Sequence, residues 1–288
     1  MMVPLTAGNL QTVSAALAQA AARITVSATP RLDAELLLAA ALGISRTQLR
    51  TWPDRQVSSA AAAGFDAMIT RRAAGEPVAY LLGQQEFWSL PLRVTNATLV
   101  PRPETELLVE QALARMPRDV TVTAADIGTG SGAIALALAH ERPHCQVVAT
   151  DCSRAALDVA TENAARLGVG NIRFVEGSWF EPLAGGRFAV IVSNPPYVAP
   201  DDPHLQQDGL RFEPPTALIA ADNGLAGLRA IITTAPRHLE PGGWLLLEHG
   251  YRQGDAVRSL LAGRGYRGIE TVNDGAGSER VTMALFDL

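Results

Sequence analysis

The pattern of hydrophobic positions changes near residue 85, and the part of the chain before it is typical of helices. Three segments there have apolar side chains at helical spacing, and they cover residues 12–22, 30–42 and 57–74. In the second segment these apolar positions are Leu32, Leu36, Leu37 and Ala40. Asn9 or Thr12 is expected to cap the first helix, and Gly43 to stop the second. We therefore expect a small all-helical N-terminal domain over residues 1–84, without a catalytic motif.

Beyond residue 85, short apolar stretches alternate with longer amphipathic ones. Residues 87–94 predict a strand pair, which we place in a linker over 85–100. Strands are expected over residues 120–126, 146–151, 172–176, 188–193, 244–249 and 281–286. Helices are expected over residues 103–114, 133–140, 154–167, 225–238 and 255–262. Such alternation predicts a mostly parallel, Rossmann-like α/β sheet covered on both faces over 101–288, with ligands at the carboxyl ends of its strands.

Composition narrows the classes of partner. The 288 residues carry a formal net charge of -5, and every basic side chain except histidine is arginine. An acidic total is unlike that of a duplex-DNA-binding protein, so we expect no direct binding of nucleic acid. Cys145 and Cys152 have no second pair beside them, so we expect neither a zinc site nor a disulfide, and no metal. The alanine-rich stretch over 13–22 is too short to span a bilayer and does not resemble a signal peptide, so we expect a cytoplasmic protein that does not bind membranes.

A glycine-rich loop follows the first strand of the sheet. The sequence V-T-A-A-D-I-G-T-G-S-G-A over 122–133 places Gly128, Gly130 and Gly132 between that strand and a helix. Glycine permits positive φ and a close approach of the backbone to a ligand, and the helix N-terminus offers unpaired amide groups. Asp151 closes the second strand, where a carboxylate accepts hydrogen bonds from ribose hydroxyls. Loop and acid together predict a site for an adenosine-containing ligand.

The glycine spacing is G-x-G-x-G and not the G-x-G-x-x-G of dinucleotide-binding folds. It resembles that of the class I methyltransferases, which use S-adenosyl-L-methionine. Trp179, after the third strand, is expected to pack on the adenine, with a place in the core as the alternative. Ser178 stands where related sequences often carry an aspartate that binds the adenine amino group, so the adenine contact stays open.

The most informative stretch is F-A-V-I-V-S-N-P-P-Y, a buried strand that continues directly into Asn194, Pro195, Pro196 and Tyr197. Two successive prolines fix two φ angles and offer no amide donors, so the loop is stiff. The side-chain carbonyl of Asn194 and the backbone carbonyl of Pro195 both accept hydrogen bonds, and together they match the two hydrogens of a planar NH2 group. Tyr197 offers a ring face to a planar substrate. The candidate catalytic residues are therefore Asn194, Pro195 and Tyr197, and Pro196 completes the substrate-binding set.

This arrangement suits methylation of an amide nitrogen, which is a poor nucleophile because its lone pair is delocalised into the carbonyl. Two acceptors that hold the amide hydrogens would turn the lone pair towards the methyl donor, and no strong base is required. Orientation can contribute about 7–11 kcal/mol in favourable cases, and electrostatic preorganisation adds to it.

Several stretches together resemble the HemK/PrmC family, the release factor glutamine methyltransferases. They are G-Q-Q-E-F-W-S-L-P-L-R-V, V-P-R-P-E-T-E, D-I-G-T-G-S-G-A-I-A-L-A, N-P-P-Y, D-P-H-L-Q-Q-D-G-L-R-F-E-P and L-L-L-E-H-G. The resemblance is strong over residues 75–288 and general over the helical part. It implies a class I methyltransferase sheet whose substrate is the glutamine of the Gly-Gly-Gln motif in peptide chain release factors, methylated at N(5).

The resemblance also implies the site residues. The cofactor-binding set is Gly128, Thr129, Gly130, Ser131, Gly132, Asp151, Trp179 and Asn194, and the glutamine would lie against residues 194–197. Residues 101–104 and 211–214 either line the substrate mouth or form stabilising ion pairs and turns. Docking of the release factor is a hypothesis for the N-terminal domain.

Other functions stay open at this point. The Asn-Pro-Pro-Tyr loop would equally hold the amino group of adenine or cytosine in nucleic acid, although the chain has no obvious target-recognition insertion. A glutamine methyltransferase acting on a ribosomal protein is a closer alternative, and residues 202–214 favour the release factor branch. The glycine spacing opposes an NAD-dependent oxidoreductase, and the intact Asn194 loop has no obvious use in a non-catalytic adenosine-ligand sensor.

Overall fold

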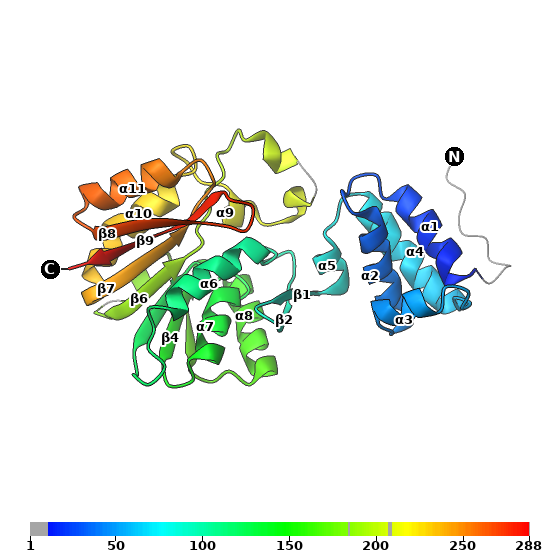
Figure 1. Ribbon diagram of the computed structural model, residues 1–288, viewed down its shortest axis with the longest axis horizontal. Helices are drawn as coiled ribbons and strands as arrows, with labels where there is room; N and C mark the ends of the chain where they lie inside the picture. The colour runs from blue at the N-terminus through cyan, green and yellow to red at the C-terminus, as the bar shows by residue number, and fades with distance from the viewer. Residues whose placement is uncertain (1–10, 184, 207–208, 288) are drawn as a thin grey trace. The chain divides into compact units, whose positions relative to one another are not determined.

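The computed structural model describes residues 11–183, 185–206 and 209–287 (Figure 1). The chain forms two compact units. One unit contains the residues up to Gly83 together with the later segment Gln206–Phe212, and the other contains Gln84–Leu205 and Glu213–Leu288. Each unit has a hydrophobic core of its own.

The first unit is built of helices. They are α1 Val13–Arg23, α2 Pro30–Leu42, α3 Arg46–Thr51, α4 Ser59–Ala73 and α5 Val78–Leu82, with the turn η4 Leu210–Phe212. The three helices predicted from the sequence are confirmed as α1, α2 and α4, within two residues at each end. Thr12 caps α1 by accepting a hydrogen bond from Ala15 N at 3.3 Å, whereas Asn9 lies outside the described residues. The apolar pattern does not predict α3 and α5, each of which has six residues or fewer.

The buried face of α2 differs from the predicted one. Leu37 is buried as expected, but Leu32 is 36% exposed and Ala40 is exposed. The carboxylates of Asp33 and Glu35 are buried in place of apolar side chains because arginines neutralise them, at distances of 2.8–3.4 Å. Charged side chains that are buried as ion pairs do not follow the spacing of hydrophobic residues. The pattern of apolar residues therefore predicts the wrong buried face for this helix.

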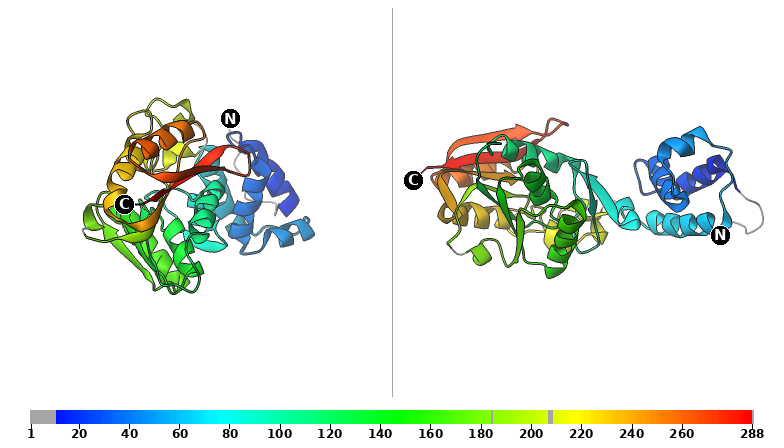
Figure 2. Two further views of the ribbon diagram at one scale, coloured as in Figure 1. Left: turned by 60° about the vertical axis from the view of Figure 1, so that its left-hand side comes forward. Right: turned by 90° about the horizontal axis from the view of Figure 1, so that it is seen from below.

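The second unit contains a sheet of seven strands in the order β5-β4-β3-β6-β7-β9-β8. The strands are β3 Thr123–Ile127, β4 Gln146–Asp151, β5 Ile172–Glu176, β6 Phe188–Ser193, β7 Leu239–Glu248, β8 Arg267–Asn273 and β9 Glu279–Phe286. Neighbouring strands are parallel except at β9, which is antiparallel to both β7 and β8. Figure 2 shows β8 and β9, in orange and red, at one edge of this sheet. The predicted mostly parallel α/β sheet is confirmed.

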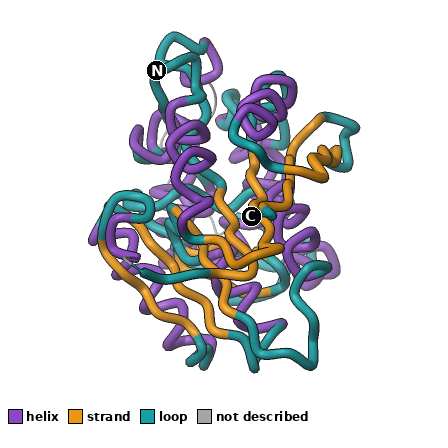
Figure 3. Tube along the Cα trace, turned by 90° about the vertical axis from the view of Figure 1, so that its left-hand side faces the viewer, coloured by secondary structure: helices purple, strands orange, loops and turns teal. Residues whose placement is uncertain are grey.

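Helices cover both faces of the sheet (Figure 3). The remaining helices of the chain are η1 Pro103–Thr105, α6 Glu106–Leu113, α7 Ala133–Glu141, α8 Arg154–Leu167, α9 Pro215–Leu218, α10 Ala226–Thr234 and α11 Gly254–Gly263, with further single turns at η2 Glu181–Leu183, η3 Pro203–Gln206 and η5 Ala235–Arg237. Successive strand residues face opposite cores, as period-two geometry requires. In β6, for example, Val190 and Val192 belong to the core formed with α6 and α7, and Ile191 belongs to the core formed with α10 and α11.

A two-stranded hairpin precedes the sheet. The strands β1 Gln84–Phe87 and β2 Leu90–Arg93 are antiparallel, so the predicted strand pair is confirmed. Trp88 and Ser89 form the turn with φ of 54° and 59°, the positive values that a tight hairpin turn requires. Asn163 of α8 holds the end of this hairpin, because its side chain accepts from Arg93 N at 2.7 Å and donates to Arg93 O at 3.0 Å.

Candidate active site

A pocket lies at the carboxyl ends of β3, β4 and β6, where the strand order reverses, as expected for ligands of such a sheet. All residues that line it belong to the second unit. The predicted site residues on its wall are Gly128, Thr129, Gly130, Ser131, Asp151, Trp179, Asn194 and Pro196. The predicted residues Gly132, Pro195 and Tyr197 do not line it. Ser178 and Cys152 are also part of the wall.

The glycine loop has the backbone that its sequence requires. Gly128, Gly130 and Gly132 have φ of 81°, 57° and 85°, a region that side chains other than glycine rarely adopt. Gly132 is the N-cap residue of α7 and lies against α8, since an added Cβ would lie 3.1 Å from the Cβ of Ala160. The amides of Gly128 and Thr129 both donate to the carbonyl of Thr150, at 2.9 and 2.8 Å, which fixes the loop against β4.

Asp126 lies beneath this loop and is fully buried. Its Oδ2 accepts a hydrogen bond from Thr129 Oγ1 at 2.7 Å. Among the described residues its Oδ1 has no hydrogen-bond partner. Burial raises the pKa of Asp126 to about 7, and the charge of Asp151 acts in the same direction.

Asp151 is held by backbone amides. Its Oδ2 accepts from Gly130 N at 2.8 Å and its Oδ1 from Ser153 N at 2.9 Å. A carboxylate oxygen has two lone pairs, so each oxygen can accept one further hydrogen bond from a ligand hydroxyl. The hydrogen bond from Gly130 N joins Asp151 directly to the glycine loop. The two features predicted from the sequence, the loop and the acid, are therefore parts of one site.

Trp179 lies between the glycine loop and α10. Its ring is half-buried and packs against the core on the α10 side of the sheet, and its indole also lines the pocket. A Cβ added to Gly128 would lie 3.8 Å from Cζ3 of the ring, and one added to Gly227 would lie 3.4 Å from Cη2. Trp179 therefore belongs to the pocket wall and also packs against the core, and its packing on the adenine stays a prediction.

Asn194 follows β6 at the wall of the pocket. The preceding Ser193 donates to Ile127 O at 2.5 Å and so fixes the end of β6 to the end of β3. The Asn194 amide donates from Nδ2 to Thr105 Oγ1 at 3.2 Å. Because Nδ2 is engaged by Thr105, the acceptor Oδ1 is the end of this amide that is left for a ligand.

Tyr197 is held at both its hydroxyl and its backbone. The hydroxyl donates to Glu248 Oε1 at 3.2 Å, and burial raises the pKa of Tyr197 well above its usual range. Gln253 Nε2 donates to the Tyr197 carbonyl at 3.0 Å, while Gln253 Oε1 accepts from Gly250 N at 2.9 Å. The Tyr197 carbonyl also packs so closely on Gly224 that no side chain fits there. Thr105, Glu248 and Gln253 have no role in the sequence-based prediction because they lie far from residue 194 along the chain.

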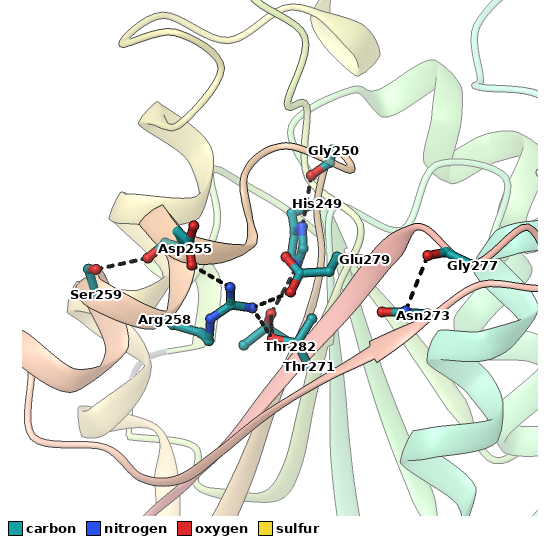
Figure 4. Close-up of polar contacts among 10 residues, drawn as sticks. All are labelled: His249, Gly250, Asp255, Arg258, Ser259, Thr271, Asn273, Gly277, Glu279 and Thr282. Atoms are coloured by element: carbon teal, nitrogen blue, oxygen red, sulfur yellow. Dashed lines mark hydrogen bonds and ion pairs between the residues drawn. The ribbon is translucent and has the colours of Figure 1, made fainter.

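The residue after Glu248 in sequence is His249, whose buried side chain is reached by a chain of hydrogen bonds with a fixed direction (Figure 4). His249 Nδ1 lies 3.0 Å from Gly250 O, which can only accept, so Nδ1 carries the proton. Burial lowers the pKa of His249, so Nε2 of the neutral ring accepts from Thr282 Oγ1 at 2.8 Å. Thr282 in turn accepts from Thr271 at 2.8 Å, and Thr271 accepts from Arg258 at 2.8 Å. These bonds hold the turn that follows β7.

The rim of the pocket contains an ion pair between Arg102 and Glu213. Glu213 is 3% exposed, and its second oxygen accepts from Val100 N at 2.9 Å. Arg102 also lines the pocket, so this part of the rim is both wall and ion pair. Arg211 does not belong to the rim, because it lies in the first unit and donates to the carbonyl of Ala74.

Over the described ranges, no three His, Cys, Asp or Glu side chains are grouped so that they could hold a metal ion. In the same residues, no helix has the length and apolar character needed to cross a bilayer.

Comparison with known proteins identifies both parts of the chain. Residues 15–83 match the PrmC N-terminal domain, and residues 103–208 match the methyltransferase small domain. The chain is 50% identical over 278 residues to the release factor glutamine methyltransferase of Vibrio cholerae serotype O1, which covers 96% of this chain and 97% of the relative. It is 54% identical over 257 residues to the enzyme of that name from Pseudomonas aeruginosa, which covers 89% and 93% of the two chains.

Among solved structures, a methyltransferase from Pyrococcus furiosus is similar with a TM-score of 0.51 and 21% identity, over 77% of this chain and 98% of that one. At this level of identity the similarity is one of fold alone. Together with the strand order, it assigns the second unit to the class I methyltransferase fold, as the glycine spacing predicts.

Proposed function

The chain belongs to the family of release factor glutamine methyltransferases, and on this premise we propose that it methylates N(5) of the Gly-Gly-Gln glutamine in peptide chain release factors. The methyl donor would be S-adenosyl-L-methionine. The observation that carries this proposal is Asn194, which stands at the end of β6 on the pocket wall with its Nδ2 bound to Thr105. The side-chain carbonyl is thereby available to accept a hydrogen from the substrate amide.

The pocket suits S-adenosyl-L-methionine. Asp151 keeps a free lone pair on each oxygen for the ribose hydroxyls, and the glycine loop brings its backbone to the pocket without side chains. The flat indole of Trp179 offers a surface for the adenine, and Ser178 beside it is a neutral contact. When bound, the cofactor supplies a methyl group on a positively charged sulfur.

The chain's own residues would bind and orient the glutamine. Asn194 Oδ1 and the carbonyl of Pro195 would each accept one hydrogen of its NH2 group, which directs the nitrogen lone pair at the methyl group. Pro195 and Pro196 keep these two acceptors at a fixed separation because their φ angles are fixed. Tyr197 is anchored by Glu248 and Gln253, so the loop holds its shape while the substrate enters.

The N-terminal unit would dock the release factor. Residues 1–83 contain seven arginines against five acidic residues, whereas the whole chain is acidic. Arg23, Arg71 and Arg72 form ion pairs with Asp66, Glu76 and Asp33, in that order. Three further arginines, Arg31, Arg46 and Arg50, share Glu35 as their one acidic partner among the described residues.

These three side chains are 54%, 38% and 65% exposed, and Trp52 near them in sequence is 49% exposed. Arginine and tryptophan are enriched among residues that dominate binding energy at protein interfaces. We therefore infer that the surface formed by Arg31, Arg46, Arg50 and Trp52 contacts an acidic region of the release factor.

One experiment tests the proposed function. The protein is incubated with methyl-labelled S-adenosyl-L-methionine and either purified release factor, ribosomal protein or nucleic acid. Label on the release factor, located by mass spectrometry at the glutamine of Gly-Gly-Gln, is the expected result. Label only on adenine or cytosine, or only on a ribosomal protein, would contradict the proposal.

A further inference from the structure

Asn163 of α8 is a buried side chain that binds two other parts of the second unit at the same time. It is 1% exposed. Its Oδ1 accepts from Arg93 N at 2.7 Å, and its Nδ2 donates to Arg93 O at 3.0 Å and to Ser131 O at 2.9 Å. Arg93 ends the β1–β2 hairpin, and Ser131 belongs to the glycine loop. One amide therefore joins the hairpin to the loop, and both of its hydrogens are used.

Ser131 is the place where the glycine loop passes from the pocket wall into α7. It lines the pocket and is 3% exposed. The peptide unit between Ser131 and Gly132 is held at both ends. Its carbonyl accepts from Asn163, and its N–H donates to Thr129 O at 2.9 Å. Because a peptide unit is planar, these two bonds fix its orientation, and with it the backbone on the pocket wall.

The glycine loop needs such bonds because glycine leaves the backbone many conformations. The first half of the loop is fixed by β4, which accepts hydrogen bonds from the amides of residues 128–130. The second half lies against α8. Ala160 of α8 is so close to Gly132 that an added Cβ would lie 3.1 Å from its own, and Asn163 is three residues further along the same helix face. The helix α8 thus supplies both a packing contact and a hydrogen bond to this half of the loop.

We propose that Asn163 is a positioning residue, which holds the glycine loop in its cofactor-binding conformation and couples it to the end of the β1–β2 hairpin. The inference rests on the proposed function, in which the loop binds S-adenosyl-L-methionine. A cofactor bound to the loop favours the conformation in which Ser131 O faces Asn163, and this contact keeps the Asn163 amide turned towards Arg93. Coupling between two sites is reciprocal, so an ordered hairpin end favours cofactor binding to the same extent.

The chain offers two matched controls. Glu162, the neighbour of Asn163 in sequence, also binds the hairpin, through an ion pair with Arg93. Glu162→Ala therefore loosens the hairpin but leaves the bond to Ser131 O in place. Asn171 has the same chemistry as Asn163, since its Nδ2 donates to three backbone carbonyls at 2.9–3.1 Å. Those carbonyls belong to residues outside the pocket wall of the described structure, so Asn171→Ala reports the loss of stability alone.

The first test measures the Kd for S-adenosyl-L-methionine by calorimetry in the full chain. Asn163→Ala should raise the Kd by about 5- to 150-fold, the usual size of a coupling between two sites. Glu162→Ala and Asn171→Ala should keep Kd values close to that of the wild type, although Asn171→Ala should lower the urea midpoint of unfolding. An unchanged Kd for Asn163→Ala, or an equal rise for Asn171→Ala, would overturn the inference.

The second test uses the wild-type protein, so it does not depend on whether a variant folds. Amide hydrogen exchange is followed by NMR with and without saturating S-adenosyl-L-methionine. Exchange at Arg93 N, which donates to Asn163, should slow by about 5-fold or more when the cofactor binds. Gly277 N, which donates to Asp274 O at 2.9 Å in the turn between β8 and β9, is the internal control and should not change.

Equal exchange at Arg93 N with and without cofactor would overturn the coupling. Equal slowing at Gly277 N would also overturn it, because the cofactor would then stabilise the whole unit without a specific path through Asn163. Failure of the wild-type protein to bind S-adenosyl-L-methionine would instead contradict the proposed function.

Discussion

At Asn194 the two ends of one side-chain amide have different neighbours, because Nδ2 donates to Thr105 and the carbonyl remains for the ligand. Replacement by alanine removes the acceptor. We expect Asn194→Ala to abolish detectable methyl transfer to a Gly-Gly-Gln peptide while lowering the affinity for S-adenosyl-L-methionine only modestly. Single-turnover assays with labelled cofactor measure the first quantity and calorimetry the second. Turnover above about a tenth of the wild-type value would contradict the role of this acceptor, since loss of transition-state stabilisation should appear directly in kcat.

Asp151 is a single residue whose expected role is to bind the cofactor. A charge-assisted hydrogen bond is worth about 1.5–3 kcal/mol, so Asp151→Ala should weaken binding of S-adenosyl-L-methionine by about ten- to a hundredfold. The loss should reach the upper part of this range because Gly130 N and Ser153 N also lose their acceptor. Asp158→Ala is the matched control, since this aspartate is 62% exposed on α8 and pairs with Arg154. Similar calorimetric affinities for the two variants would contradict the assignment of Asp151.

Glu248 also predicts a pH dependence of stability. Burial raises its pKa to about 7 in the folded protein against 4.5 as the ordinary value, so the native state binds this proton more tightly than the unfolded chain does. Tighter binding of this proton by the native state therefore stabilises the fold, and the whole of this stabilisation is present below about pH 4.5. It is lost as the pH rises through about 7, and each unit of difference between the two pKa values corresponds to about 1.4 kcal/mol in the free energy of unfolding. Glu248→Gln should lack that loss. Urea unfolding at pH 5 and pH 8 should therefore show the variant gaining stability relative to wild type at the higher pH, and a constant difference would refute the shift.

At the scale of elements, the turn after β7 depends on bonds that come from two other strands, β8 and β9. Thr282→Val would leave Nε2 of the buried His249 without a donor, which costs about 1–3 kcal/mol. Thr282→Ser keeps the hydroxyl and should be affected much less. The free energies of unfolding in urea distinguish the two variants. If both lost stability equally, the packing of the threonine methyl group would matter and the hydrogen bond would not.

The same elements show what the sequence can predict and what it cannot. The bounds of β4, β5, β6 and α8 agree with the prediction residue for residue, because each is a buried apolar run or an amphipathic helix with a clear stop. The strand β7 begins five residues before its predicted start at Trp244, since Pro241, Gly242 and Gly243 read as a turn. The strand β8 was missed by the apolar pattern because it lies at the sheet edge and most of its side chains are partly or fully exposed.

The candidate site was predictable to the extent that its residues are adjacent in sequence. The glycine loop and the Asn-Pro-Pro-Tyr loop are contiguous motifs, and the sheet topology then brings them to one pocket. Thr105 and Glu248 lie 89 and 54 residues away from Asn194 in opposite directions along the chain. No spacing rule connects residues so far apart, and only the fold places their side chains together.

At the scale of the whole molecule, the two units should separate in function. We expect a fragment beginning at Gln84 to bind S-adenosyl-L-methionine like the full chain, because every residue of the pocket lies in the second unit. It should methylate intact release factor much more slowly, since a stable protein interface buries about 1,200–2,000 Å² and one glutamine supplies far less. With a Gly-Gly-Gln peptide as substrate, fragment and full chain should be alike.

Charge reversal tests the same division in the full chain. Arg46→Glu with Arg50→Glu should raise the KM for intact release factor and leave the peptide reaction unchanged, whereas Arg154→Glu on the exposed surface of α8 should change neither. Equal methylation of release factor by the fragment, the double variant and the wild type would rule out docking by the N-terminal unit.

The segment Gln206–Phe212 belongs to the first unit although it follows most of the second in sequence. Arg211 donates to the carbonyl of Ala74, and the side chains of Arg211 and Phe212 lie against Gly75. During synthesis, which proceeds at about 5–20 residues per second, the first 83 residues leave the ribosome without this last piece. The N-terminal unit therefore stays incomplete for the time taken to add more than a hundred further residues, and its surface reaches its final form only when the catalytic sheet is half built.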